Sequence, residues 1–291
     1  MIKCVTVSFP KLRREKMIKP EIAFIMRSDE MIKEYNLKRI TVDTSYGPVD
    51  RCYVGKVHGI DVMVIYGRFN GQKVPSDMIN YQQNVEAVKN MGCKNLVGTF
   101  VVGGIVPERN AGTTYVLGDI VGMGNYHISV NQQYGFHNAE MYKPFCESLT
   151  KQLKIASRKM TFNVITDAIY VCFHGWPRIE TKAELDFYNR MGWDIVGQTC
   201  DPEATCARLA GLCYAGVAVQ IDDPMHREED IDNLDGEKKN TNSMSISEYR
   251  RSTTSIIMQF IKDYKENSCE KCCNLKRTNN SFKEFPGFMY E

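Results

Sequence analysis

The sequence predicts an α/β fold in which strands and helices alternate and pack in layers. Short runs rich in Val, Ile and aromatic residues, typical of strands buried on both faces, alternate with longer segments of helical periodicity. The composition is that of a globular protein, because 43% of the 291 residues are apolar and 25% are charged. One large α/β domain with a sizeable core can account for this length.

Five segments have the strand pattern, and we expect them to form the sheet. They are Ile60–Tyr66, Asn95–Val102, Phe162–Phe173, Asp194–Thr199 and Leu212–Ile221. Each is short and bounded by turn-forming or polar residues, so each fits a strand better than a helix.

Two helices are predicted in the first half of the chain. After Pro75, apolar residues recur every three or four positions, and Gly92 then ends the helix as a C-cap. Pro144 opens a second helix, whose apolar positions run from Phe145 to Met160 on one face.

Two more helices are predicted in the second half. Asp201 and Pro202 form an N-cap and first-turn pair, and Gly211 closes that helix. Ser245 and Glu248 form a capping box before a final amphipathic helix that we expect to pack on the sheet.

The chain divides into one main domain and two accessory ends. We expect an N-terminal extension at 1–18, the domain at 19–266, and a Cys-containing tail at 267–291 that frays from it. Within the domain, 226–244 is almost entirely polar and charged and reads as an exposed loop, with a lid as the alternative.

Charge and cysteine content exclude several classes of protein. Because 37 Lys and Arg are balanced by 35 Asp and Glu, the chain has no strong positive electrostatic field that would attract nucleic acid or anionic lipid. Apolar stretches are too short for a membrane span, and the first residues lack the apolar run of a secretory signal. The odd number of 11 cysteines indicates reduced core thiols and a cytoplasmic protein, with the nucleus as a further option.

Glycines follow three predicted strands, where ligands of open α/β sheets bind. They are Gly67, Gly103 with Gly104, and Gly197. They either form ordinary turns or let the backbone approach an anion closely. Neither the dinucleotide nor the Walker glycine spacing is present, which argues against a nucleoside triphosphate site.

Three charged residues beside these turns are candidates for chemistry. Arg68 could hold phosphate with its guanidinium fork or be a solvated surface residue. Asp222 could be a general acid, a ligand of a base or a helix cap, and Glu180 could be a ligand contact or a first-turn helix residue.

No metal is expected. Cys269-x-x-Cys272-Cys273 resembles half of a zinc motif, but a structural zinc site needs four ligands and no second Cys or His pair lies nearby. The five histidines show no metal-binding spacing either, and no hydrolase triad stands out.

A series of short motifs between Lys19 and Glu266 carries a family resemblance. The motifs are Val42-Asp43-Thr44 with Gly47, Tyr66-Gly67-Arg68-Phe69, Pro75-Ser76, Asn80-Tyr81-Gln82, Gly118-Asp119-Ile120-Val121, Lys143-Pro144-Phe145-Cys146, Pro177-Arg178-Ile179-Glu180-Thr181, Pro202-Glu203 and Leu212-Cys213-Tyr214-Ala215. In this order and spacing they resemble the trimeric purine nucleoside phosphorylases, and within them the methylthioadenosine phosphorylase branch.

The resemblance implies a fold and an activity. The fold would be a single three-layer domain with a central mixed, partly barrel-like sheet flanked by helices, assembled as a homotrimer. The activity would be phosphorolysis of a purine nucleoside or of methylthioadenosine, as in purine salvage, with inorganic phosphate as co-substrate and no other cofactor.

The resemblance also assigns roles to residues. Asp222 would be the catalytic acid at purine N7, and Ser28, Arg68 and Thr199 would bind phosphate. The substrate would contact Phe100, Val101, Gly103, Ile179, Glu180 and Gln198. Glu180 matches enzymes that act on 6-oxopurines, whereas Asp222 matches those that act on 6-aminopurines, so the pair leaves the purine open.

Several positions depart from the family pattern. Arg27-Ser28-Asp29 replaces the glycine-rich first turn, which removes both glycines and is expected to put a carboxylate beside the anion. The family's histidine is either replaced by Asn70 or absent, Phe100 stands where the family has Asn or Thr, and Gln198 stands where it has Met. All four changes fall in one pocket.

Three hypotheses follow. The first is a working phosphorylase with an altered pocket. The second is a catalytically inactive or impaired member that acts as a binding or structural protein. The third is a nucleoside hydrolase, in which water replaces phosphate as the nucleophile.

Overall fold

The computed structural model describes residues 19–69, 74–124, 139–173, 178–226, 245–266, 269 and 271–274. The predicted N-terminal extension and most of the polar loop and tail lie outside this range, as does Asn70. In the described part, no helix combines the length and apolar character needed to cross a membrane.

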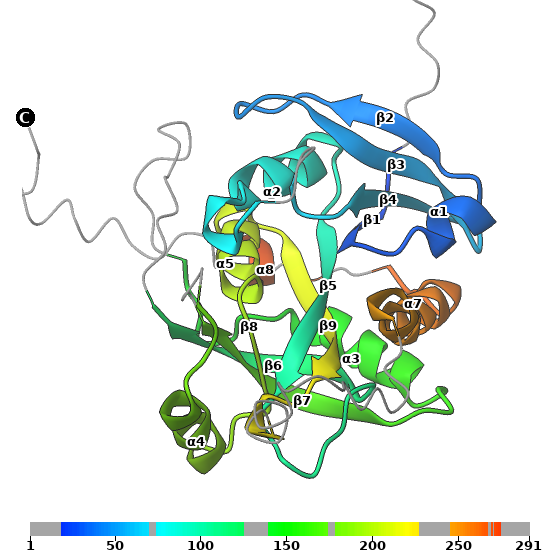
Figure 1. Ribbon diagram of the computed structural model, residues 1–291. Helices are drawn as coiled ribbons and strands as arrows, with labels where there is room; N and C mark the ends of the chain where they lie inside the picture. Colours follow the sequence, from blue (N-terminus) through cyan, green and yellow to red (C-terminus); the bar gives the residue numbers. More distant parts are fainter. Residues whose placement is uncertain are drawn as a thin grey trace, which may run out of the picture.

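Helices and strands alternate along much of the chain as predicted, but β2, β3 and β4 follow one another without a helix between them, and so do β5 and β6 (Figure 1). The strands are β1 (Ile22–Met26), β2 (Lys38–Val42), β3 (Val49–Val57), β4 (Ile60–Tyr66), β5 (Asn95–Gly104), β6 (Thr114–Met123), β7 (Val164–Phe173), β8 (Ile195–Gly197) and β9 (Cys213–Asp222). The helices are α1 (Glu30–Glu34), α2 (Tyr81–Asn90), α3 (Glu147–Ser157), α4 (Lys182–Arg190), α5 (Cys200–Ala210), α7 (Ile246–Lys262) and α8 (Lys271–Asn274), with 3₁₀ turns η1 (Ser76–Met78) and η3 (Pro224–His226).

The strands form one mixed sheet that is partly closed into a barrel. Its order is β2-β3-β4-β1-β5-β8-β7-β6-β9, and β5 also pairs with β9. The last five strands therefore form a ring, while β2, β3, β4 and β1 extend from it as an open sheet. The mixed, partly barrel-like sheet expected from the resemblance is confirmed.

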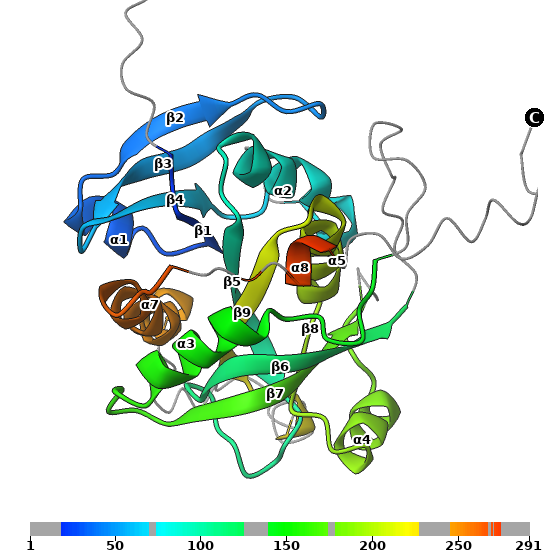
Figure 2. The same cartoon turned by 180° about the vertical axis from the view of Figure 1, so that it is seen from behind.

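Helices cover both faces of the sheet (Figures 1 and 2). Successive side chains of β1 point to opposite faces of the sheet, and both faces are packed. Ala23 and Ile25 belong to a core shared with α2 and α5, whereas Phe24 belongs to a core shared with α3 and α7. The Phe24 ring meets the edge of the Phe260 ring, with centroids 6.4 Å apart. These two cores give the three layers.

Helix boundaries follow the local signals, with one correction. The capping box of Ser245 and Glu248 is present at α7, and Gly211 ends α5 in the left-handed region at φ 74°. The predicted N-cap at Asp201 is wrong, since α5 begins at Cys200 and Thr199 is its N-cap residue. Asp201 instead accepts a hydrogen bond from the Thr205 hydroxyl inside the helix.

The strand pair β5–β9 links two distant parts of the molecule. The strands run parallel, with Asn95 opposite Cys213 at one end and Gly103 opposite Asp222 at the other. Gly103 and Gly104, expected in a turn, are strand residues. The carboxyl end of this pair borders a cavity.

Candidate active site

A cavity of about 650 Å³ lies at the carboxyl ends of β5 and β9, beside the segments that follow β1, β4 and β8. This volume is typical of a site for a small organic ligand. The structure brings nine of the ten predicted site residues to its wall: Arg68, Phe100, Val101, Gly103, Ile179, Glu180, Gln198, Thr199 and Asp222. Their individual roles remain predictions.

Arg68 lines the cavity but is already paired. Its Nε and Nη2 donate to the two carboxylate oxygens of Glu203 at 2.7 and 3.0 Å, and Nη1 donates to the Thr99 carbonyl at 3.0 Å. The guanidinium also lies over the Phe100 ring, 4.4 Å from its centroid. Burial alone would lower the pKa of Arg68, but the charge and hydrogen bonds of Glu203 outweigh it and raise the pKa.

Glu203 is completely buried and accepts a third hydrogen bond, from the Tyr214 hydroxyl at 2.8 Å. Gly98 makes room for this arrangement, because a Cβ there would lie 2.4 Å from the Glu203 carboxylate and 2.7 Å from the Tyr214 hydroxyl. The buried carboxylate therefore neutralises much of the charge that Arg68 could offer to a ligand.

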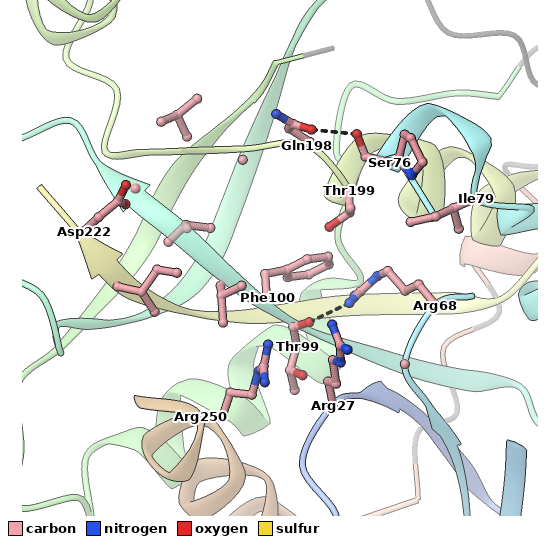
Figure 3. A pocket seen from close by; sticks show the side chains of 18 of the residues that line it. Arg27, Arg68, Ser76, Ile79, Thr99, Phe100, Gln198, Thr199, Asp222 and Arg250 are labelled. Carbon is pink, nitrogen blue, oxygen red and sulfur yellow. Dashed lines mark hydrogen bonds between the residues drawn. The ribbon is translucent and has the colours of Figure 1, made fainter. Parts of the chain in front are cut away.

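Two further arginines line the cavity, Arg27 after β1 and Arg250 in the first turns of α7. Figure 3 shows the guanidinium groups of Arg27, Arg68 and Arg250 gathered around Thr99. Among the described residues, Arg27 and Arg250 have no carboxylate within salt-bridge distance. Burial, followed by the charges of Arg27 and Arg68, lowers the pKa of Arg250. This end of the cavity therefore holds excess positive charge.

Ser28 and Asp29 do not take the positions expected of them. Neither lines the cavity. The Ser28 hydroxyl accepts the Glu30 N–H at 3.4 Å, and the Asp29 carboxylate pairs with Lys33 at 2.6 Å, so both serve the start of α1. The expectation that a carboxylate would lie beside the anion is wrong, because the chain turns into α1 directly after Arg27.

Thr199 adds a hydroxyl to the positive end. As the N-cap residue of α5 it makes no side-chain capping bond, and Figure 3 shows its hydroxyl turned toward the interior of the cavity. The positive end of an 11-residue helix lies behind it. The neighbouring Gln198 is held by the Ser76 hydroxyl, which donates to Oε1 at 2.6 Å.

Phe100 forms part of the floor and does not fill the cavity. It is 4% exposed, and its ring packs edge-on against Tyr170 with centroids 5.6 Å apart. Together with the backbone of Val101 to Gly103 it offers an apolar surface between the two ends of the cavity.

Asp222 lies at the end of the cavity opposite the arginines (Figure 3). It ends β9 with an exposed side chain. Gly103 across the strand pair permits this position, since a Cβ there would lie 3.0 Å from the Asp222 carboxylate and 2.8 Å from the Pro224 ring. Glu180 and Ile179 approach from the loop before α4, so Glu180 precedes the N-cap Thr181 and is not a first-turn residue.

Arg250 was not among the site residues predicted from the sequence, and Arg27 was not assigned a role of its own. A signal for Arg250 was present: it shares one face of α7 with Thr253, Thr254 and Ile257, all buried, so an arginine there must point inward. Arg27 directly follows a fully buried strand that ends beside Gly67, where the Gly67 N–H bonds the Met26 carbonyl at 2.7 Å.

Comparisons with known proteins identify the family of the chain. The sequence pattern of the Phosphorylase superfamily matches residues 21–249. A probable S-methyl-5'-thioinosine phosphorylase of Thermodesulfovibrio yellowstonii is 34% identical over 185 residues, 62% of this chain and 69% of that protein. The 6-oxopurine nucleoside phosphorylase of Pyrococcus furiosus is 32% identical over 63% of this chain and 72% of its own length.

A solved structure has the same fold. Methylthioadenosine phosphorylase from Schistosoma mansoni, in complex with tubercidin, aligns over 84% of this chain and 91% of its own, with a TM-score of 0.67 and 22% identity. The superfamily match spans most of the chain, including every described element from β1 to β9. The chain therefore belongs to the Phosphorylase superfamily.

Proposed function

We propose that this protein cleaves the N-glycosidic bond of a purine nucleoside or of methylthioadenosine by phosphorolysis, releasing the free purine and a sugar 1-phosphate. The observation that carries the proposal is the polarity of the cavity, which has arginines and a threonine hydroxyl at one end and the Asp222 carboxylate at the other. Inorganic phosphate is the co-substrate, and no other cofactor is needed.

The two ends suit the two reacting partners. Phosphate bound at the arginine end would attack the anomeric carbon of the sugar, which would lie over Phe100. The C–N bond breaks with its electrons going to the purine, while a C–O bond to phosphate forms. Asp222 in its protonated form would donate to purine N7 and so ease departure of the base. Most of the rate gain then comes from positioning and electrostatics.

We assign phosphate binding mainly to Arg27 and Arg250. The guanidinium of Arg68 bonds both carboxylate oxygens of the buried Glu203, which offsets much of the charge that Arg68 could offer to a ligand. Arg27 and Arg250 have no carboxylate partner among the described residues, and they line the cavity together with Thr99 and Thr253. A bound dianion would relieve their mutual repulsion.

The residues at the Asp222 end of the cavity are compatible with both 6-oxopurines and 6-aminopurines. Glu180 could accept N1–H of a 6-oxopurine, and Asp222 could serve either class through N7. The relatives are similarly divided, since one acts on 6-oxopurine nucleosides and another, from Nitrosopumilus maritimus, is an S-methyl-5'-thioadenosine phosphorylase. Both kinds of nucleoside therefore belong in the assay.

A homotrimer is the assembly we infer from the family resemblance. Two exposed apolar side chains at or beside the cavity support a partner there: Ile179 on its wall is 55% exposed, and Met78, between Ser76 and Ile79, is 69% exposed. Sedimentation of the purified protein tests this, with a single trimeric species as the expected result and a monomer as the contrary one.

A second candidate function is nucleoside binding without turnover. The Arg68–Glu203 ion pair favours it, because the residue that the resemblance assigns to phosphate is neutralised. This candidate predicts measurable nucleoside affinity that does not depend on phosphate and no base release.

One assay separates the candidates. The purified full-length chain is incubated with inosine, guanosine, adenosine or methylthioadenosine, with and without phosphate, and free base is measured by chromatography. Base release that requires phosphate supports phosphorolysis. Release without phosphate indicates hydrolysis and contradicts the proposal, and nucleoside binding without any release identifies the second candidate.

A further inference from the structure

Four cysteines from three separate parts of the chain meet on the face of the molecule covered by α3 and α7. Cys146 is the N-cap residue of α3, Cys213 is the first residue of β9, and Cys269 and Cys272 come from the C-terminal segment that contains α8. Their four sulfur atoms all lie within 4.8 Å of one another. Figure 2 shows α8 beside the start of β9.

The spacing suits a tetrahedral metal ion. Zinc–thiolate bonds of about 2.3 Å place the sulfurs of a regular tetrahedron about 3.8 Å apart. The Sγ atoms of Cys269 and Cys272 are 3.6 Å apart, so this Cys-x-x-Cys pair already has the separation of two zinc ligands. A disulfide would need two of the four sulfurs at bonding distance, and it would not account for the convergence of all four.

The surroundings suit a structural ion. Cys146, Cys213 and Cys272 are 1%, 2% and 5% exposed and belong to the core shared with α3 and α7. Cys146 is the N-cap residue of the 11-residue α3 and makes no side-chain capping bond, so the helix terminus does not engage its sulfur. With four protein ligands, the ion would keep no open position for catalysis.

We propose that Cys146, Cys213, Cys269 and Cys272 form a closed tetrahedral site for a structural zinc ion. Binding replaces four thiol protons with one Zn²⁺ and releases the protons to solvent, with no change of oxidation state. The expectation of no metal rested on separation along the sequence, and the fold supplies the second pair from α3 and β9. The ion would fasten the C-terminal segment to the start of β9, whose other end carries Asp222.

Metal analysis of the purified full-length chain tests the site. We expect about one zinc per chain by inductively coupled plasma mass spectrometry, retained through gel filtration. The variants Cys213→Ser and Cys269→Ser/Cys272→Ser should lose most of it. Cys93→Ser and Cys206→Ser, which replace buried cysteines outside the cluster, should keep it.

A second measurement guards against variants that fail to fold. Wild-type protein stripped with a chelator and reloaded with Co²⁺ should show thiolate-to-cobalt charge-transfer bands and the intense visible bands of a tetrahedral site. Metal-free protein with four freely titrating thiols would overturn the proposal. So would an intact mass and peptide map showing a Cys269–Cys272 disulfide, or iron in place of zinc.

Discussion

The two ends of β9 differ in burial and in the role that we assign to them. At its amino end, Cys213 is 2% exposed and lies in a tight group of four cysteines inside the core. At its carboxyl end, Asp222 is exposed at the wall of a cavity of about 650 Å³. One strand thus joins a packed end, which fixes its position, to an open end that can receive a ligand. Changes at the open end should alter rate, and changes toward the packed end should alter stability.

The largest expected effect is at the open end. Asp222→Asn should lower kcat/KM for base release by about 10²- to 10⁴-fold, the usual contribution of a positioned general acid. Thermal unfolding should hardly change, because the side chain is exposed. Asp186→Asn, at a partly exposed position on α4 outside the cavity lining, is the matched control and should keep full activity. A large loss of stability with unchanged kcat/KM in Asp222→Asn would contradict the catalytic role that we assign to Asp222.

Arg68 bonds the carbonyl of Thr99, which lies opposite Val217 in the middle of β9. A change at Arg68 therefore tests whether this middle region affects mainly stability or mainly rate. Arg68→Met leaves the buried Glu203 carboxylate without its cation, so we expect the free energy of unfolding to fall by about 3–5 kcal/mol in urea denaturation. Adding Glu203→Gln should restore most of the loss, since it removes the unpaired charge. If Arg68→Met instead kept its stability and only raised the KM for phosphate, Arg68 would be the main phosphate ligand.

Adjacent arginines on α7 give the next test. Arg250 lines the cavity, whereas Arg251 points to the surface and pairs with Glu30 at 3.1 Å. Loss of charged hydrogen bonds in Arg250→Gln should raise the KM for phosphate about 10- to 100-fold. Arg251→Gln should leave it unchanged. Equal phosphate KM values in steady-state assays of the two variants would contradict our assignment.

The smallest expected effect concerns the ion pair between Arg178, in the loop before α4, and Glu184 in α4. The same loop contains Glu180, which lines the cavity. Hydrogen bonds from Arg178 and Thr181 lower the pKa of Glu184 to about 2. The ionised carboxylate therefore stabilises the fold at neutral pH, and this contribution should disappear as the pH falls from about 4 to about 2.

Glu184→Gln should thus reduce the free energy of unfolding at pH 7 by at most about 1 kcal/mol, because the group lies near the surface. The wild type and the variant should converge as the pH falls below 4 in chemical denaturation. Glu248→Gln in the capping box of α7, where Ser245, and no arginine of the described residues, bonds the carboxylate, should have a smaller effect. A constant difference across this pH range would argue against the ion pair as the cause.

Much of the fold could be predicted because most of its central strands are continuously apolar, although β1, which is equally apolar, and β3 were not among the five predicted strands. The bounds predicted for β4 are those of the structure, and the other four predicted strands were found within a few residues. The edge strand β2 and the helices α1 and α4 escaped prediction because they are short and half-polar. β6 escaped because its second half is partly exposed and contains Gly118 and Gly122, which resemble loop residues.

The site was predicted less completely than the fold. The match to the family motifs was enough to identify nine residues that line the cavity. It could not reveal that Glu203, 135 residues away in the sequence, neutralises Arg68, or that Arg250 reaches the same space from α7. For the same reason the fourfold cysteine cluster was missed, since its members are neighbours only after folding.

The most direct test of the central claim follows the phosphate itself. Phosphorus NMR during turnover of the best nucleoside substrate should show orthophosphate converted into a sugar 1-phosphate, in equal amount to the free purine. Purine release with the orthophosphate signal unchanged would contradict the account, as would the absence of both products from every nucleoside tested.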